Sequence, residues 1–259
     1  MFSEYSLKTI EIFWTGGYDS TFRILQLSQL PVKIRPFYLS DNRKSEKLEL
    51  SAIKNITEEI KIRKETKCEI LPLEIITKNQ RISNKKITDA FNRLLEKDYM
   101  GSQYEWLGWF AEGHKDIELS IHEDDKAIEL IKRHGKLKLI SDDIIGDNYI
   151  IDEENSSEDI ITVFKNFHFP LAKLTKLVMK EHYLQWDCKK IMNITWFCFT
   201  PIRGKPCGLC NPCKYTIEEG MTERFTKVAL MRYKLIPIIE ILKAVYRKIR
   251  LRKSRKHIA

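Results

Sequence analysis

The sequence of 259 residues lacks the features that mark a membrane, secreted or disordered protein. No stretch reaches the roughly 18 consecutive apolar residues that a membrane-spanning helix needs. No N-terminal segment combines a basic flank, an apolar run and a small-residue cleavage site. Hydrophobic residues make up 43% of the chain, which is enough to close a core. We therefore expect a soluble, cytoplasmic protein that forms one large domain or two small ones.

The last seventeen positions contain no acidic residue, and the basic residues there account for most of the net charge of +9. That stretch contains eight basic residues: Lys243, Arg247, Lys248, Arg250, Arg252, Lys253, Arg255 and Lys256. Without them, 37 basic residues face 36 acidic ones, a balance of +1. A nearly neutral body with a basic tail argues against a phosphate-tracking surface across the whole fold.

The first 76 residues alternate between strand and helix patterns. Strands are predicted over 7–14, 32–39 and 68–76, with helices after the Gly16-Gly17 pair and over 48–64. In the first strand, Ile10, Ile12 and Trp14 would share one face, and Pro31 would end the first helix. This alternation predicts an α/β fold with a parallel sheet and helices on its faces.

Beyond residue 100 the same alternation continues with one interruption. We expect an aromatic-rich buried helix over 101–111, a buried strand over 117–121, and helices over 124–133 and 172–186. Residues 136–152 alternate around Gly146-Asp147 and predict a β-hairpin that could be an insertion. The acidic, Ser-containing stretch 152–159 is the best linker candidate.

The octet Trp14-Thr15-Gly16-Gly17-Tyr18-Asp19-Ser20-Thr21 lies where a strand ends and a helix begins. Adjacent glycines let a ligand approach the main chain, and the first amides of a helix favour anions. Hydroxyls at Thr15, Ser20 and Thr21 would add phosphate donors. An ordinary strand-to-helix turn with a Ser or Thr cap fits the same residues. The octet is neither a Walker A loop nor a Gly-x-Gly-x-x-Gly dinucleotide turn.

Four of the six cysteines lie within sixteen positions, at Cys198, Cys207, Cys210 and Cys213. Gly208 and Pro212 allow the tight reversals that would bring the sulfurs together. Four thiolates make a closed site of the kind that binds structural zinc. A [4Fe-4S] cluster, unligated thiols or a redox pair are the alternatives. We expect Cys68 and Cys188 to fill gaps in the core.

These motifs together resemble a known family. The octet is similar to the Ser-Gly-Gly-x-Asp-Ser motif of the PP-loop ATP pyrophosphatases, with Thr15 in place of the first serine. Three further segments, 169–176, 195–199 and 205–213, resemble in order the C-terminal motifs of 7-cyano-7-deazaguanine synthase, an enzyme of queuosine biosynthesis. The resemblance spans residues 11–220, and its two ends carry the matching residues.

The resemblance implies a doubly wound, Rossmann-like PP-loop domain over 1–220, with a zinc subregion over 195–220 and the hairpin 136–152 as an insertion. A basic helical extension would follow over 221–259. The implied cofactors are ATP, Mg2+ and Zn2+. The implied ATP-binding residues are Thr15, Gly16, Gly17, Asp19, Ser20 and Thr21, the catalytic ones Asp19, Ser20 and Lys176, and the zinc ligands Cys198, Cys207, Cys210 and Cys213. Thr175 would lie beside Lys176. We also expect a homodimer.

The middle of the chain departs from the family's pattern. The synthase segment Pro-Gly-Arg-Asn is replaced by 100–103, the segment Gly-x-Asn-x-x-Asp by 119–125, and Ser-Gly-Tyr-Pro-Asp-Cys-Arg is missing. Residues 122–125 could hold Mg2+ or an amine, or could cap a helix. Trp106 and Trp109 could stack on a base or belong to the core.

The resemblance implies an ATP-dependent ligase that adenylates 7-carboxy-7-deazaguanine or a related carboxylate, releases pyrophosphate and forms an amide or nitrile with ammonia or an amine. Three alternatives stay open: an enzyme that joins a deazaguanine to a protein amine, a tRNA-modifying PP-loop enzyme, and a non-enzymatic zinc module that binds nucleic acid. The segment 235–251 predicts an amphipathic helix that could contact RNA, a protein or an anionic membrane, or could be a frayed terminus.

Overall fold

The computed structural model of the protein describes residues 7–238. The chain divides into two compact units. The first comprises residues up to 42 together with 46–196, and the second comprises 43–45 and the chain from 197 onward. Most of the predicted tail helix 235–251 lies outside the described residues, so the predicted boundary at residue 220 stays a prediction.

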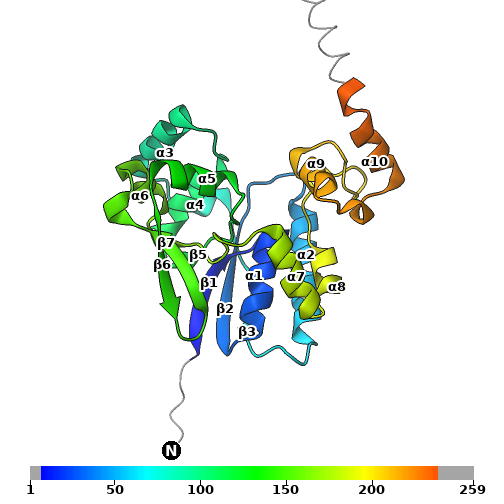
Figure 1. The fold of residues 1–259 in the computed structure, drawn as a ribbon, viewed down its shortest axis with the longest axis horizontal. Helices are drawn as coiled ribbons and strands as arrows, with labels where there is room; N and C mark the ends of the chain where they lie inside the picture. Colours follow the sequence, from blue (N-terminus) through cyan, green and yellow to red (C-terminus); the bar gives the residue numbers. More distant parts are fainter. Residues whose placement is uncertain (1–6, 239–259) are drawn as a thin grey trace, which may run out of the picture. The chain divides into compact units, whose positions relative to one another are not determined.

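The first unit is built on a six-stranded sheet in which every described strand pairing is parallel (Figure 1). The strand order is β3-β2-β1-β5-β8, and β4 pairs with β2 beyond the end of β3. The strands are β1 (Lys8–Phe13), β2 (Val32–Leu39), β3 (Glu69–Ile70), β4 (Glu74–Ile76), β5 (Ile117–Glu118) and β8 (Phe167–His168). The predicted α/β class with a parallel sheet is therefore confirmed.

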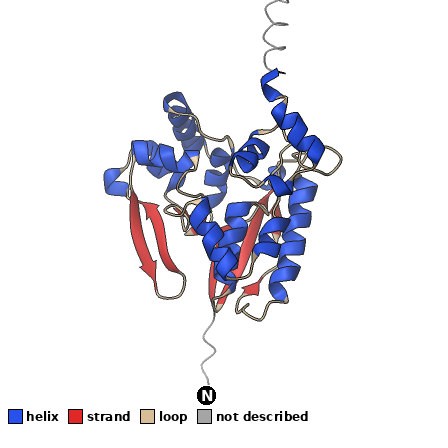
Figure 2. Cartoon of the chain, turned by 45° about the vertical axis from the view of Figure 1, so that its right-hand side comes forward, coloured by secondary structure: helices blue, strands red, loops and turns tan. Residues whose placement is uncertain are grey.

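Helices cover both faces of this sheet, because β1 carries apolar side chains on both sides (Figure 2). Ile10, Ile12 and Trp14 share one face, as predicted, and Phe13 packs on the other. The first face is covered by α1 (Tyr18–Ser28), α2 (Glu46–Lys61), α7 (Lys176–Gln185) and α8 (Lys189–Ile194). The second is covered by α3 (Lys85–Lys97), α4 (Gln103–Ala111), α5 (Lys126–His134) and α6 (Glu158–Phe164).

One predicted strand is wrong in its extent. The segment 68–76 forms two short strands, β3 and β4, and not one. Pro72 lies between them and has no N–H to donate to a ladder, so the pairing with β2 is interrupted there. A short 3-10 turn, η1 (Lys78–Gln80), follows β4.

The predicted hairpin is confirmed as β6 (Leu137–Asp142) and β7 (Gly146–Ile151), which pair antiparallel. Its loop is 143–145, just before the predicted Gly146-Asp147 turn, and Gly146 has φ +74°. Asp142 accepts hydrogen bonds from two loop amides and pairs with Lys8 at the start of β1. The linker candidate 152–159 forms η2 (Glu153–Asn155) and the start of α6, inside the first unit.

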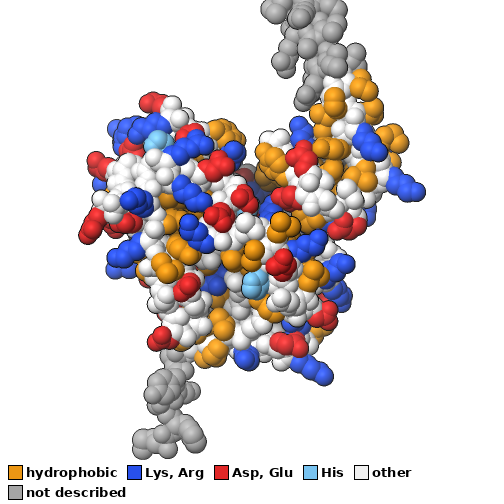
Figure 3. Space-filling model, in the orientation of Figure 1, with side chains coloured by type: hydrophobic (Ala, Val, Ile, Leu, Met, Phe, Trp, Pro, Cys, Tyr) orange, Lys and Arg blue, Asp and Glu red, His pale blue; other side chains and the backbone are white. Residues whose placement is uncertain are grey.

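The described part of the second unit contains α9 (Asn211–Glu218), η3 (Thr222–Arg224) and α10 (Lys227–Lys234). It holds eight of the seventeen large hydrophobic side chains that are exposed in the described chain: Phe199, Ile202, Leu209, Tyr215, Val228, Met231, Leu235 and Ile238. Figure 3 shows such side chains interspersed with Lys and Arg over α10. Across residues 7–238, no helix has the length and apolar character that crossing a bilayer requires.

Candidate functional site

The loops that leave β1 and β5 lie at the same edge of the sheet. These strands are parallel neighbours, with Ile12 opposite Glu118 in their register. The chain leaves β1 to form β2 on one side, whereas β5 is added on the other side. In open parallel sheets, ligands bind outside the carboxyl ends of the strands where the strand order reverses in this way. The candidate site is therefore the meeting point of the β1–α1 and β5–α5 loops.

Gly16 is required at this turn by packing. Its φ is +68°, and a Cβ atom there would lie 2.9 Å from the Glu49 carbonyl oxygen on α2 and 3.1 Å from Ile53 Cγ1. Its own carbonyl accepts a hydrogen bond of 2.8 Å from the amide of Trp196. The positive φ and the close approach of α2 explain the glycine without a ligand.

Gly17 differs from its neighbour. It is the N-cap of α1 with φ −77° and ψ 175°, and no side chain caps this helix in the described structure. A Cβ atom there would contact only Thr15 Oγ1 at 3.2 Å and the Trp196 carbonyl oxygen at 3.7 Å. Folding therefore does not demand glycine here as strongly as it does at Gly16. Glycine at position 17 is instead explained by the close approach of a ligand to the uncapped first turn of α1.

The hydroxyl groups of the turn lie in three different environments. Thr15 is exposed. Ser20 is 8% exposed, and its Oγ makes no hydrogen bond within residues 7–238. Thr21 is fully buried, and its Oγ1 accepts a hydrogen bond of 3.1 Å from the Trp14 indole. The Thr21 hydroxyl thus has a structural partner, whereas Ser20 has unused capacity.

The loop after β5 brings further polar atoms to this edge. Ser120 Oγ and His122 Nδ1 are buried and make no hydrogen bond in the described chain. His122 Nδ1 lies 3.7 Å from Asp19 Oδ2, which places the loop beside the first turn of α1. Buried polar atoms are nearly always hydrogen-bonded in native proteins, so these two atoms have capacity for a hydrogen bond to a water or a ligand.

The end of this loop has a structural role. Asp125 caps α5 by accepting from the Ala127 amide, and its Oδ1 also accepts from the Tyr104 hydroxyl at 3.2 Å. Burial raises the pKa of Tyr104 well above its usual range, and the charges of Asp125 and Asp19 raise it further. Of the two uses considered for 122–125, capping is confirmed for Asp125.

A third segment reaches the same loop. The Leu174 carbonyl accepts a hydrogen bond of 3.0 Å from the Glu123 amide. Thr175 then caps α7 through the Val178 amide, and the half-buried Lys176 opens that helix. The structure thus joins the segment that carries Lys176 to the loop that carries His122. The role of Lys176 in ATP handling stays a prediction.

Sequence reasoning did not assign Ser120 to the site, and it left His122 open between ligand binding and a helix cap. One signal could have selected them: they directly follow a strand that neighbours β1 on the side where the strand order reverses.

The tryptophans of α4 are partly buried against the core. Trp109 donates to Thr88 Oγ1, and the Arg81 guanidinium lies 4.2 Å from the Trp106 ring centroid.

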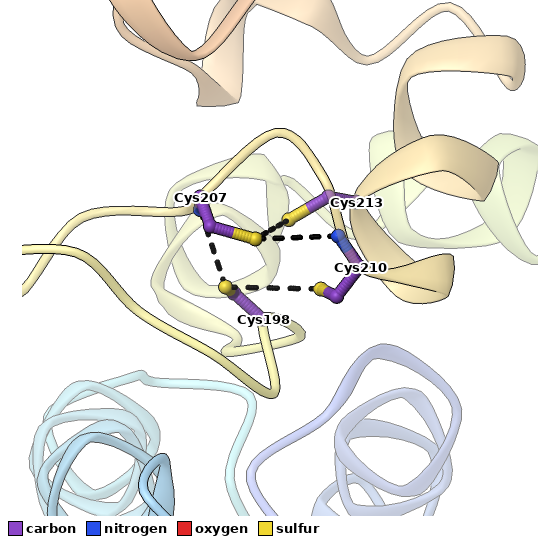
Figure 4. A group of neighbouring side chains, drawn as sticks. All are labelled: Cys198, Cys207, Cys210 and Cys213. Carbon is purple, nitrogen blue, oxygen red and sulfur yellow. Dashed lines mark hydrogen bonds between the residues drawn. The ribbon is translucent and has the colours of Figure 1, made fainter. Parts of the chain in front are cut away.

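The four predicted metal ligands come together in the second unit (Figure 4). Their Sγ atoms all lie within 4.8 Å of one another. The Cys198–Cys210 and Cys207–Cys213 Sγ distances are 3.9 and 3.8 Å. Four thiolates at about 2.3 Å from one zinc ion form a tetrahedron with edges of about 3.8 Å. The cluster could therefore hold a zinc ion, and it suits one ion better than a cluster in which each thiolate binds a different iron.

The backbone around these cysteines is arranged to stabilise thiolates. The amides of Cys207, Leu209 and Cys210 point at Sγ atoms over 3.2–3.3 Å. The turn needs Gly208, because its φ is +75° and a Cβ atom would lie 2.1 Å from the Ala229 carbonyl oxygen. Hydrogen bonds from Cys198 and Cys213 lower the pKa of Cys210, and the bond to Cys210 raises the pKa of Cys198 to about 12. A dication would let all four ionise.

A cavity of about 600 Å3 lies elsewhere in the first unit, against the amino-terminal half of β1 and the β6–β7 hairpin. Its lining contains three ion pairs: Lys8 with Asp142, Arg35 with Glu11, and His168 with Asp116. Burial lowers the pKa of His168. Within residues 7–238, no buried polar atom that lacks a hydrogen bond lines this cavity. The unmet hydrogen-bonding capacity therefore lies at the carboxyl edge of the sheet and not in this cavity.

Comparison with known proteins gives no family assignment. No protein-family model matches the chain, and no curated protein matches it.

Proposed function

We propose that the protein is an ATP-dependent, AMP-forming ligase of the PP-loop type that activates a carboxylate. The observation that carries this proposal is the set of buried polar atoms without hydrogen bonds, Ser20 Oγ in the first turn of α1 and Ser120 Oγ and His122 Nδ1 on the loop after β5, at the carboxyl edge of β1 and β5. The strand order supports a doubly wound, Rossmann-like fold. The uncapped start of α1 at Gly17 supports phosphate binding.

The proposed chemistry is adenylyl transfer. A substrate carboxylate oxygen attacks the α-phosphorus of ATP, the bond to the β-phosphate oxygen breaks, and pyrophosphate leaves. Ammonia or an amine then attacks the acyl carbon, gives up a proton and displaces AMP, which leaves an amide. A second ATP would then be attacked at its α-phosphorus by the amide oxygen, with release of pyrophosphate and one N–H proton, and loss of AMP and the remaining N–H proton would give a nitrile. The substrate we propose is 7-carboxy-7-deazaguanine or a related deazapurine carboxylate.

In this reaction the chain aligns groups and stabilises charge, and forms no covalent intermediate with the substrate. The turn Thr15–Gly17 and the first turn of α1 would hold the terminal phosphates. Asp19 would bind Mg2+, which when present offsets phosphate charge. Lys176, at the start of α7, would offset phosphate charge with its own ammonium group. The zinc ion would stabilise the second unit and take no part in catalysis, because four thiolates leave it no open position.

The free thiols argue against a sulfur-transfer reaction on tRNA. Burial raises the pKa of Cys68 to about 11 and also raises the pKa of Cys188. Cys188 is fully buried as well. A reactive cysteine needs a thiolate that is accessible at neutral pH. Both residues instead pack against the core, which fits their predicted role.

A second candidate is transfer of the activated carboxylate to an amine on a protein. Two observations favour it: the synthase's substrate segment is replaced at 119–125, and the second unit exposes eight large hydrophobic side chains. Exposed apolar side chains form a site of protein interaction where they make a contiguous patch. The first half of the reaction would be identical.

The test is to incubate the protein with ATP, Mg2+, 7-carboxy-7-deazaguanine and ammonia, and to identify the products by mass spectrometry. We expect AMP, pyrophosphate and the amide or nitrile. Gly17→Ala is the matched variant: we expect it to fold, because its Cβ atom meets no backbone closer than 3.7 Å, yet to lose AMP formation. ADP and phosphate as products, or full activity in Gly17→Ala, would contradict the proposal.

A further inference from the structure

Three buried donor groups at the carboxyl edge of the sheet lack hydrogen bonds within the described residues: Ser20 Oγ, Ser120 Oγ and His122 Nδ1. They come from the first turn of α1 and from the loop after β5, which follow neighbouring strands, so they are not a local defect of one turn. Ser20 is more than nine-tenths buried, and the His122 side chain is 12% exposed. A hydroxyl or imidazole N–H buried without a hydrogen bond costs free energy, and an oxyanion can accept from donors of both kinds.

The position of His122 indicates which part of a nucleotide it would meet. Its Nδ1 lies 3.7 Å from the carboxylate of Asp19, the second residue of α1. One helical turn spans only about 5.4 Å. An anion held on the uncapped first turn of α1 would therefore lie within reach of the imidazole. The base of the nucleotide would extend further from this turn than its phosphates do.

The local charge allows a phosphate contact. A phosphate beside Asp19 would be repelled by that carboxylate, and the Mg2+ proposed at Asp19 would offset this repulsion when bound. The His122 ring lies beside the same carboxylate and could donate a ring N–H to a phosphate oxygen. Ser120, two residues earlier on the same loop, would add a neutral donor.

We infer that His122, assisted by Ser120, binds a phosphate group of the nucleotide, opposite the Gly17 end of α1. This inference rests on the proposed function. It assigns a phosphate contact to residues 119–125, which stand where the synthase has a substrate-recognition segment. This loop would therefore bind the nucleotide.

The test measures binding of the α,β-methylene analogue of ATP with Mg2+ by calorimetry. We expect His122→Gln to weaken binding about tenfold or more, and Ser120→Ala to weaken it less. His134→Gln is the matched control, because His134 Nε2 is also buried without a hydrogen bond and lies 3.6 Å from Asp98, but on the far end of α5. That variant should bind as the wild type does. Thermal unfolding without ligand shows whether each variant folds.

A second measurement needs no substitution at His122. In the wild-type protein, the His122 ring signals in an NMR spectrum should shift when the analogue is added, and the His134 signals should not. If the wild type binds but His122→Gln binds equally well, or the His122 signals stay fixed, the inference is wrong and the proposed function stands. If the folded wild type does not bind the analogue at all, the proposed function fails and the inference fails with it.

Discussion

At the scale of single residues, the two glycines of the β1–α1 turn serve different purposes. Gly16→Ala places a side chain at positive φ and within 2.9 Å of a backbone oxygen, so we expect it to lower the free energy of unfolding by roughly 2–4 kcal/mol. Gly146→Ala is the control, since it has the same backbone strain but open space around it, and should cost about 1 kcal/mol. Denaturant unfolding measures both. Equal losses would show that packing on α2 does not fix Gly16.

A buried ion pair links α1 to β5, which are elements that flank the two candidate loops. Arg23 of α1 donates two hydrogen bonds of 2.8 and 2.6 Å to Glu118 of β5, and both side chains are almost fully buried. We expect Glu118→Gln to destabilise the fold by about 3–5 kcal/mol, because the guanidinium stays buried without its counter-charge. Glu59→Gln breaks the exposed pair with Lys190 and should cost at most about 1 kcal/mol. Similar losses for both variants would contradict this account.

At the scale of elements, the hairpin is tied to β1 by Lys8 and Asp142. The hydrogen bond from Lys8 holds the pKa of Asp142 at about 2, below its ordinary value of 3.8. The unfolded chain thus binds this proton at higher pH than the folded one does. Stability from the pair is present above pH 3.8 and is lost as the pH falls towards 2. Asp142→Asn should flatten acid unfolding in that window, whereas the neighbouring Asp143→Asn should not.

The second unit, which contains the cluster of four cysteines, is expected to depend on metal for its stability. We expect one zinc per chain by elemental analysis, and a chelator should unfold the second unit, because metal binding and folding are coupled in such sites. Cys210→Ser should reduce zinc content, while Cys68→Ser, outside the cluster, should not. Stoichiometric iron, or a metal-free protein with unchanged thermal unfolding, would overturn the zinc assignment.

Local patterns predicted most elements, because side-chain alternation and helix-ending residues act over short distances. The strand 32–39 was predicted with its observed bounds, and the hairpin 136–152 was recognised from its alternation. The break at Pro72 was not used, so β3 and β4 were predicted as one strand. The Ser120–His122 contribution depends on β5 lying next to β1, and no local pattern encodes which strands become neighbours.

At the scale of the whole molecule, charge and function are distributed unevenly along the chain. Residues 197–259 contain 15 basic and 4 acidic residues, a balance of +11, which leaves 30 basic and 32 acidic residues for 1–196, a balance of −2. The proposed catalytic edge belongs to the first unit and the cysteine cluster to the second. Under the proposed function, adenylation would be a property of the first unit, and the basic second unit would be the part that attracts an acidic partner.

The central claim is that a carboxylate oxygen attacks the α-phosphorus of ATP. The most direct measurement uses 7-carboxy-7-deazaguanine labelled with 18O in its carboxylate, together with ATP, Mg2+ and ammonia. The account predicts that one 18O atom appears in AMP and none in pyrophosphate. Label in inorganic phosphate accompanied by ADP, or AMP that carries no label while the amide forms, would contradict it.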